Sequence, residues 1–468
     1  MKIKAQIVAA LFLCLLPMSA RADEVDEYVK AFINQRNIPG LSLAVVRDGK
    51  LVKAAGYGLA NLELNVPATP ETVYEIGSIS KQFTAEAVLL LVEEGKLSLD
   101  DTLGKHLDGL PPAWQTLTLR QLLTHTSGLK DWEAANILSF RREYTAAEFI
   151  KLMSPFALDF TPGERWSYTN TAYPLLGMII ARVSGKSYEE FVTERIFKPL
   201  GLSATRFNQP LEIVPYRASG YVEESGRLQK GEPLRPRLIA PNGGIITTVL
   251  DMAKWERIFY TEQILKQASL EQMRTPVRLN DGRTFNAGFG LFMDVFRGHR
   301  LMLHNGSTVA GFSSVFYHYP SDKLTVIVLC NIDRGNAVNQ LATRVASFYV
   351  PGLTISALPE QPDPAPKMSE ALLNMLRDLA AGREPDLLLP EWRGRVPQTT
   401  RAKIAAQLSS LRRFAFLDQE KPEQGASLSG TSVAQILRYK LMSGERAIYY
   451  TFELTGDGKV ARMVFEEQ

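Results

Sequence analysis

The 468-residue sequence contains only two cysteines, and this scarcity narrows the kinds of fold it can adopt. Cys14 lies in an apolar N-terminal run, and Cys330 ends the apolar run 324–329. If the N-terminal run is removed, one cysteine remains, and it cannot form an internal disulfide. We expect Cys330 to be a buried structural thiol. The fold should therefore depend on a large hydrophobic core and not on covalent cross-links.

The sequence also lacks an excess of charge of one sign and a set of metal ligands. Lys and Arg number 53 and Asp and Glu number 50, and the first 22 residues hold three basic residues and no acidic one. The remainder is neutral, 50 against 50, so charge gives no indication of binding to nucleic acid or anionic membranes. The five histidines show no spacing typical of a metal site, and we expect no cofactor.

Residues 1–22 have the three parts of a secretory signal peptide. A start with two lysines precedes the apolar run 7–17, and the sequence Ala-Arg-Ala at 20–22 offers a cleavage site before Asp23. The apolar run is too short to span a membrane. We therefore predict a periplasmic or secreted protein with no membrane span after cleavage.

Hydrophobic periodicity predicts the fold of residues 23–350. Strand patterns occur at both ends of this region, at 41–55 and 285–330, and the stretch 96–241 between them is helical and rich in loops. We predict a mixed α/β (α+β) domain in which an antiparallel sheet, assembled from both ends, is flanked by helices and carries an all-helical insert.

The chain is too long for one core, and a second folded region is expected after it. Five prolines make residues 351–366 a stiff linker. Residues 367–468 have the pattern of a small α+β domain, with two helices before a strand meander, which resembles the NTF2-like fold. It holds no cluster typical of a site, and one hypothesis is that it docks a partner.

Ser78 and Lys81 form a Ser-x-x-Lys motif at the start of a predicted helix that runs through 85–94. Positions three apart share one face of a helix, so Lys81 would lie beside the Ser78 hydroxyl. A serine needs a neighbouring base to become a nucleophile, and a lysine with a pKa lowered by burial can provide one. The motif alone is common, and a helix-capping serine followed by a solvent-exposed lysine is the alternative.

Two further motifs follow along the chain, Tyr168-x-Asn170 and His304-Asn305-Gly306. Together with Ser78-x-x-Lys81 they resemble the serine β-lactamase and penicillin-binding superfamily. The nearest branch is that of class C β-lactamases, D-alanyl-D-alanine carboxypeptidases and esterases. The flanking segments 122–129, 162–164, 197–201 and 243–244 match as well. The resemblance covers roughly residues 24–350 and does not reach the C-terminal region.

This resemblance implies a role for each motif residue. Ser78 would attack a carbonyl and form an acyl-enzyme, Lys81 would take or relay its proton, and Tyr168 would protonate the leaving group and help to activate water. Nearby positive charge on Lys81 is expected to favour the Tyr168 phenolate. The substrate-binding residues would be Asn170, His304, Gly306 and Ser307. The oxyanion hole would consist of the N–H groups of Ser78 and Ser307, and Gly306 would let the substrate lie against its strand.

The sequence departs from the family β-lactamases at His304, where they usually have the lysine of Lys-Thr-Gly. A histidine with a pKa near 6.5 is only partly protonated at neutral pH, so only a fraction of it carries the charge that binds a substrate carboxylate. We therefore predict a serine hydrolase that cleaves an ester, a D-amino-acid peptide or a β-lactam, with carboxypeptidase or esterase activity above β-lactamase activity. The substrate would be a small molecule or derived from peptidoglycan. The alternative is a non-hydrolytic penicillin- or muropeptide-binding sensor. We expect His125 to be a helix-terminal residue without a catalytic role.

Overall fold

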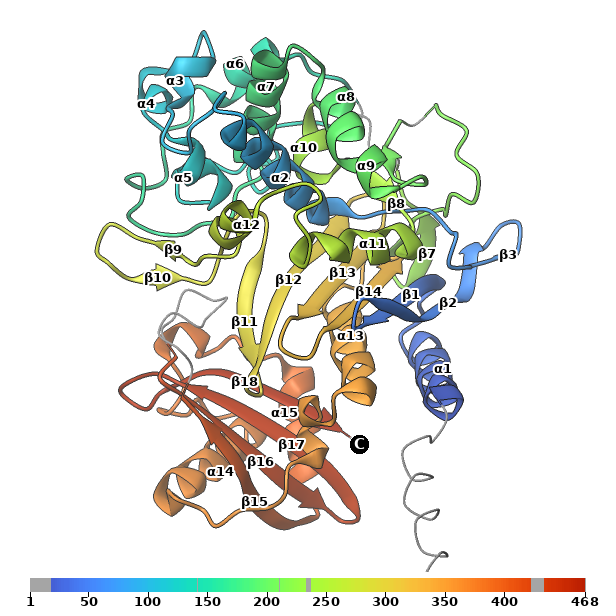
Figure 1. Ribbon diagram of the computed structural model, residues 1–468. Coiled ribbons are helices and arrows are strands. Elements are labelled where there is room, and N and C mark those ends of the chain that lie inside the picture. Colours follow the sequence, from blue (N-terminus) through green and yellow to red (C-terminus); the bar gives the residue numbers. More distant parts are fainter. Residues whose placement is uncertain (1–17, 141, 210, 233–236, 422–432, 468) are drawn as a thin grey trace, which may run out of the picture.

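The structure is a computed structural model that describes residues 18–140, 142–209, 211–232, 237–421 and 433–467 (Figure 1). Residues 1–17 of the expected signal peptide lie outside these ranges, and the first helix, α1, spans Met18–Gln35. None of the helices in the described ranges combines the length and the apolarity that a membrane span requires.

A seven-stranded sheet forms the centre of the larger part of the molecule, with the strand order β11-β12-β13-β14-β1-β2-β3. Its strands come from both ends of this part, as predicted: β1 (Gly40–Arg47), β2 (Lys50–Asn61) and β3 (Val66–Pro67), then β11 (Phe292–Phe296), β12 (His299–Thr308), β13 (Phe312–Tyr319) and β14 (Leu324–Cys330). Antiparallel pairing of β1 with β14, from Leu41 opposite Cys330 to Arg47 opposite Leu324, joins the two sets.

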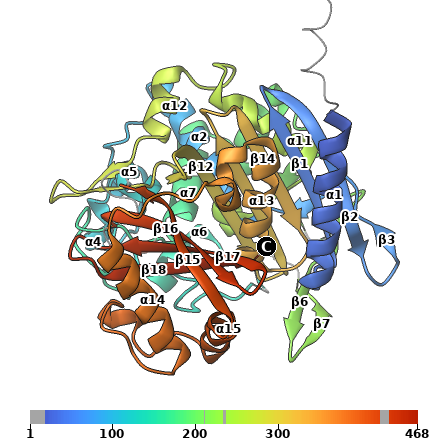
Figure 2. The ribbon, with the colours of Figure 1, turned by 90° about the horizontal axis from the view of Figure 1, so that it is seen from below.

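Successive side chains of the central strands point to opposite faces of the sheet, and both faces are buried by packed helices. On β14, Val326, Val328 and Cys330 pack on one side with the helices α1 and α13 (Gly335–Tyr349), whereas Ile327 and Leu329 pack on the other. The second face is covered by α2 (Ser80–Glu93) and α11 (Val249–Trp255), and Figure 2 shows α1 and α13 together on the first face. Cys330 is free and fully buried in this core.

Helix α2 is the central helix of the second layer, and its residues 80–91 are all buried. A helix that is buried all round must be surrounded by other elements. Helices α7 (Ala172–Ser184), α8 (Tyr188–Val192), α10 (Ala240–Gly243) and α12 (Gln267–Met273) contact α2. Other helices of the upper part are α3 (Leu103–His106), α4 (Pro112–Gln115), α5 (Leu119–Leu123), α6 (Ala146–Met153) and α9 (Lys198–Leu200). The insert thus lies over the sheet with α2 at its centre.

The insert 96–241 also contains the short strands β5 (Arg206–Phe207), β6 (Tyr221–Glu224) and β7 (Arg227–Lys230), where only helices and loops were expected. Further short strands lie on either side of it: β4 (Tyr74–Glu75), β8 (Ile245–Thr247), β9 (Val277–Arg278) and β10 (Thr284–Phe285). Helix α5 ends at Leu123, and His125 just after it takes a left-handed conformation (φ 58°). Helix α11 is capped by Thr248, whose side chain accepts from Asp251 N.

The C-terminal part has a core of its own. Its four-stranded sheet has the order β15 (Leu411–Glu420), β16 (Gln435–Ser443), β17 (Arg446–Leu454) and β18 (Val460–Glu467), with α14 (Pro366–Ala380) and α15 (Gln398–Leu408) on one face. These elements agree with the pattern expected from the sequence, and the NTF2-like resemblance stays a prediction. Arg297, in the turn after β11, forms an ion pair of 3.0 Å with Glu466 and so ties the two parts together.

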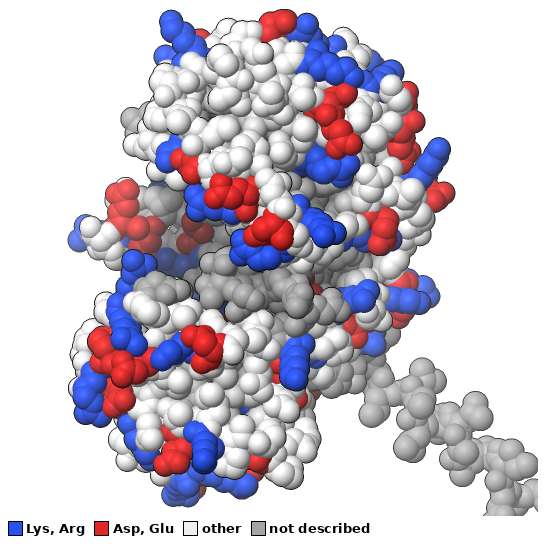
Figure 3. Space-filling view, turned by 90° about the vertical axis from the view of Figure 1, so that its left-hand side faces the viewer, with Lys and Arg blue, Asp and Glu red and all other residues white. Residues whose placement is uncertain are grey.

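The described residues on one face of the molecule carry mixed charge. Figure 3 shows this face, which lies at the left of Figure 1. Lys and Arg are interspersed with Asp and Glu on this face, and no large area of one sign is visible.

Candidate active site

Ser78 lies in a single turn of 3-10 helix, Gly77–Ile79, that leads into α2. Gly77 has a positive φ of 49°, and a Cβ at this position would lie 2.7 Å from the Ser307 carbonyl oxygen and 2.9 Å from Ser307 N. Only glycine permits this approach. The turn that carries Ser78 is therefore pressed against the end of β12, and Ser307 N lies beside Gly77, the residue before the nucleophile.

Lys81 is fully buried one turn after Ser78. Its Nζ donates to three acceptors: Ser78 Oγ at 3.0 Å, Asn170 Oδ1 at 2.9 Å and the main-chain oxygen of Asn242 at 3.0 Å. Burial lowers the pKa of Lys81 to about 7, although the carboxylates of Glu133 and Asp131 oppose the change. A large fraction of the amine is thus neutral at physiological pH and can accept the Ser78 proton.

Tyr168 lies against both of these residues. The Ser78 side chain is near enough to the Tyr168 hydroxyl to lower its pKa, and the Tyr168 ring centroid is 4.9 Å from Lys81 Nζ. Burial raises the pKa of the Tyr168 hydroxyl above its usual value near 10. The expected shift towards phenolate therefore does not occur, because the loss of hydration and then the charges of Asp131 and Glu133 outweigh the opposing effect of Ser78. In the free protein Tyr168 therefore keeps its proton, and the Lys81 amine is the group that can accept one.

Asn170 is held on two sides by acidic residues that we did not predict. Its Nδ2 donates to Glu133 Oε2 at 2.7 Å, and its backbone N donates to Asp131 Oδ1 at 3.0 Å. These bonds direct Asn170 Oδ1 towards Lys81. The predicted contact of Asn170 with a substrate amide stays a prediction, while its contact with Lys81 is present.

His304 is placed near the cluster but cannot serve as the partly charged anchor that we expected. It is 3% exposed, and its Nδ1 lies 2.7 Å from the carbonyl oxygen of Asn305, to which it donates. Burial and then the Lys81 charge lower the pKa of His304 to about 3. The ring is therefore neutral at pH 7, and it offers hydrogen bonding without a charge for a carboxylate.

Gly306 is also required for packing. A Cβ at this position would lie 1.9 Å from the carbonyl oxygen of Ile76 and 2.4 Å from Ser314 Oγ. The glycine thus lets β12 pack against the segment before Ser78, and its expected place beside the substrate stays a prediction. The neighbouring Ser307 is exposed, and its Oγ donates to Asp333 Oδ2 at 2.6 Å.

His125 packs beside the cluster formed by Ser78, Lys81 and Tyr168. It is buried, its Nδ1 accepts from Thr169 N at 3.2 Å, and its ring stacks on Tyr168 with centroids 4.4 Å apart. Burial lowers its pKa well below the usual value. His125 is thus a neutral residue that positions Tyr168, a role that the sequence did not suggest.

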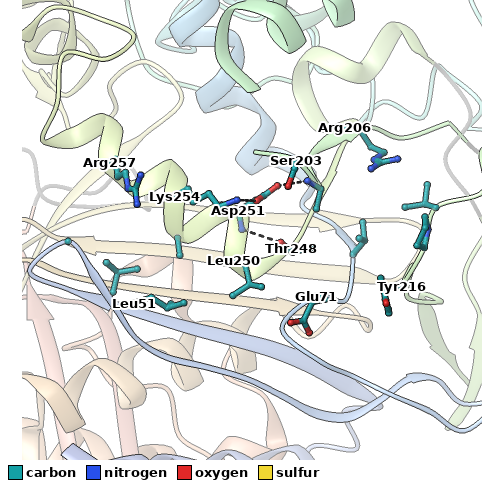
Figure 4. Close-up of a pocket in the computed structure, with 17 residues that line it drawn as sticks. Leu51, Glu71, Ser203, Arg206, Tyr216, Thr248, Leu250, Asp251, Lys254 and Arg257 are labelled. Atoms are coloured by element: carbon teal, nitrogen blue, oxygen red, sulfur yellow. Dashed lines mark hydrogen bonds and ion pairs between the residues drawn. The ribbon is translucent and has the colours of Figure 1, made fainter. Parts of the chain in front are cut away.

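A separate cavity of about 630 Å³ lies between α11 and the β1–β2 hairpin (Figure 4). Most of its lining is apolar, and Arg206, Lys254 and Arg257 lie among the polar lining residues. Asp251 is neutralised there by Lys254 at 2.8 Å. The Ser78 cluster and this cavity share no residue.

Comparison with known proteins identifies the family of this chain. The family model described as Beta-lactamase matches residues 25–349. "Penicillin-binding protein 4*" of Bacillus subtilis is 30% identical over 339 residues, which are 69% of this chain and 74% of that protein.

Two solved structures extend the comparison. The octameric penicillin-binding protein homologue from Pyrococcus abyssi is similar at 25% identity with a TM-score of 0.59, over 95% of this chain and 99% of that one. The penicillin-binding protein from Bacillus halodurans is similar at 26% identity with the same TM-score, over 68% of this chain and 98% of its own. The likeness to the first structure thus extends into the C-terminal part.

Proposed function

Because the chain belongs to the serine β-lactamase and penicillin-binding family, we propose that it is a serine hydrolase that works through an acyl-enzyme on Ser78. The observation that carries this proposal is the buried Lys81 amine, 3.0 Å from Ser78 Oγ and with a pKa lowered to about 7. An ordinary exposed lysine would be protonated at neutral pH and could not act as a base. Here the nucleophile and its base are already in hydrogen-bond contact.

The contacts of Ser78, Lys81 and Tyr168 support the following proposed sequence of proton transfers. Neutral Lys81 takes the Ser78 proton as Oγ bonds to the substrate carbonyl carbon, and the resulting oxyanion accepts from the N–H groups of Ser78 and Ser307. Tyr168 then gives its proton to the leaving group as the bond to that group breaks. Protonated Lys81 returns a proton to the Tyr168 phenolate. Water completes the cycle by attacking the acyl-enzyme, with the same groups taking and returning its proton.

Among the family's substrate types, we propose esters ahead of D-amino-acid peptides and β-lactams, which both carry a free carboxylate. The neutral state of His304 supports this order, because no permanent charge stands at this position to hold a carboxylate. The substrate would be a small molecule or a fragment of peptidoglycan. We also propose a periplasmic or secreted location, on the basis of the N-terminal sequence alone.

A chromogenic ester tests the proposed activity. Purified protein should hydrolyse p-nitrophenyl butyrate, and Ser78→Ala should lose this activity. Ser203→Ala provides the matched control, because Ser203 is an exposed serine that lines the other cavity. Equal activity in the wild type and in Ser78→Ala would refute the proposal. Acylation of Ser78 without release of the acyl group would instead indicate the sensor alternative.

A further inference from the structure

Four aromatic side chains from separate elements meet beside Tyr168. Trp166, in the loop before α7, stacks on Phe285 of β10 with centroids 4.3 Å apart and planes within 10°. Phe292 of β11 lies edge-on to Trp166 at 5.8 Å and contacts the His304 ring at 5.2 Å. The rings of Trp166 and His304 are each 6.4 Å from that of Tyr168. Tyr168 is the proposed proton donor to the leaving group, so these rings border the space that the leaving group would occupy.

Two polar atoms of this aromatic wall are buried without a hydrogen-bond partner among the described residues: Trp166 Nε1 and His304 Nε2. The indole nitrogen can only donate. Since His304 Nδ1 donates to the Asn305 carbonyl, Nε2 of the neutral ring is an acceptor. A buried polar group without a partner is costly, and two such groups beside Tyr168 point to a ligand group that can both accept and donate.

The aromatic wall formed by Trp166, Phe285, Phe292 and His304 contains no positively charged group that could bind a carboxylate. In the described part of the chain, the charge that acts on His304 is that of Lys81, whose three bonds go to Ser78, Asn170 and Asn242. Arg165 is the neighbour of Trp166 in the sequence, but its guanidinium lies over the Phe160 ring at 4.6 Å. The lone pair of His304 Nε2 would in addition repel a carboxylate oxygen.

We propose that the space bordered by Trp166, Phe285, Phe292 and His304 binds the leaving group of the substrate and selects a neutral planar group that carries a carboxamide or hydroxyl, against one that carries a free carboxylate. A carboxamide oxygen accepts from Trp166 Nε1, and its NH₂ group donates to His304 Nε2. This inference rests on the proposed acyl-enzyme function. It identifies the preferred substrates as esters or amides with an uncharged leaving group.

The test uses two aryl esters that share one acyl group and differ only in the leaving group, 3-hydroxybenzamide or 3-hydroxybenzoate. After correction for their rates of alkaline hydrolysis, kcat/KM for the carboxamide ester should exceed that for the carboxylate ester by about tenfold or more, because the charged group would be desolvated without a partner. His304→Lys should reduce or reverse this ratio. Trp166→Phe keeps the ring but removes the donor, and it should also reduce the ratio. Trp392→Phe is the matched control, since Trp392 is 42% exposed in the C-terminal part, and it should leave the ratio unchanged.

A wild-type ratio near one, or a ratio that neither His304→Lys nor Trp166→Phe changes, would overturn the inference. Labelling of Ser78 by a fluorophosphonate separates this failure from a failure of the proposed function. If Ser78 is labelled and both esters are cleaved equally, only the leaving-group preference is wrong. If Ser78 is not labelled and neither ester is cleaved, both proposals are wrong.

Discussion

The buried Lys81 amine predicts a specific pH profile for acylation. With a pKa of about 7, the neutral fraction of Lys81 is about 9% at pH 6, about 50% at pH 7 and about 91% at pH 8. Since only the neutral amine can take the Ser78 proton, kcat/KM for an uncharged ester should rise about tenfold between pH 6 and pH 8. The assay is the initial rate at low substrate concentration, with the spontaneous hydrolysis measured in Lys81→Ala subtracted at each pH.

Glu133→Gln then shifts the midpoint of this profile in a defined direction. The Glu133 carboxylate favours the charged form of Lys81, so its replacement by a neutral amide should move the midpoint to lower pH. The glutamine can still accept from Asn170, which keeps the geometry. Glu224→Gln, an exposed change on β6, should leave the midpoint in place. A flat profile between pH 6 and pH 8, or an upward shift in Glu133→Gln, would refute the assignment of Lys81 as the base.

Three further substitutions test other parts of the account. Lys81→Ala should lower kcat/KM by about a thousandfold or more with a far-UV circular dichroism spectrum like that of the wild type, and retained activity would rule out its role. Tyr168→Phe keeps the stacking on His125 but removes the proton donor, so kcat/KM should fall by about 10²–10⁴-fold, and a smaller effect would argue for another donor. Gly306→Ala should lower the free energy of unfolding by about 1–3 kcal/mol, because its methyl group would overlap the Ile76 carbonyl. In urea denaturation Gly335→Ala, whose Cβ would have no atom nearer than 3.8 Å, should show little change, and equal stability of the two variants would contradict the packing argument.

The parts of the site that the sequence predicted are those with a short local pattern. Ser78 and Lys81 are one helical turn apart, so their contact follows from helix geometry. The sheet could be predicted as well, since strands that are buried on both faces leave apolar runs such as 324–330. Such patterns depend on neighbours in the chain and can be recognised without the fold.

The parts that the sequence did not predict arise from contacts between distant segments. The Asn242 carbonyl has no side-chain signature, and Glu133 acts through Asn170 from 37 positions away. The neutral state of His304 is a consequence of burial, which the motif does not encode. Position 306 must be glycine because a Cβ there would overlap the carbonyl oxygen of Ile76, which lies in a distant segment of the chain. The residues of the aromatic wall likewise meet only after folding.

The most direct test of the central claim is mass spectrometry of the protein quenched during turnover of a slow ester, followed by peptide mapping. The account predicts an acyl group on Ser78 that accumulates and then disappears as the substrate is exhausted, and no such adduct in Ser78→Ala. Turnover with the acyl group on another residue, or without any adduct and undiminished in Ser78→Ala, would contradict it.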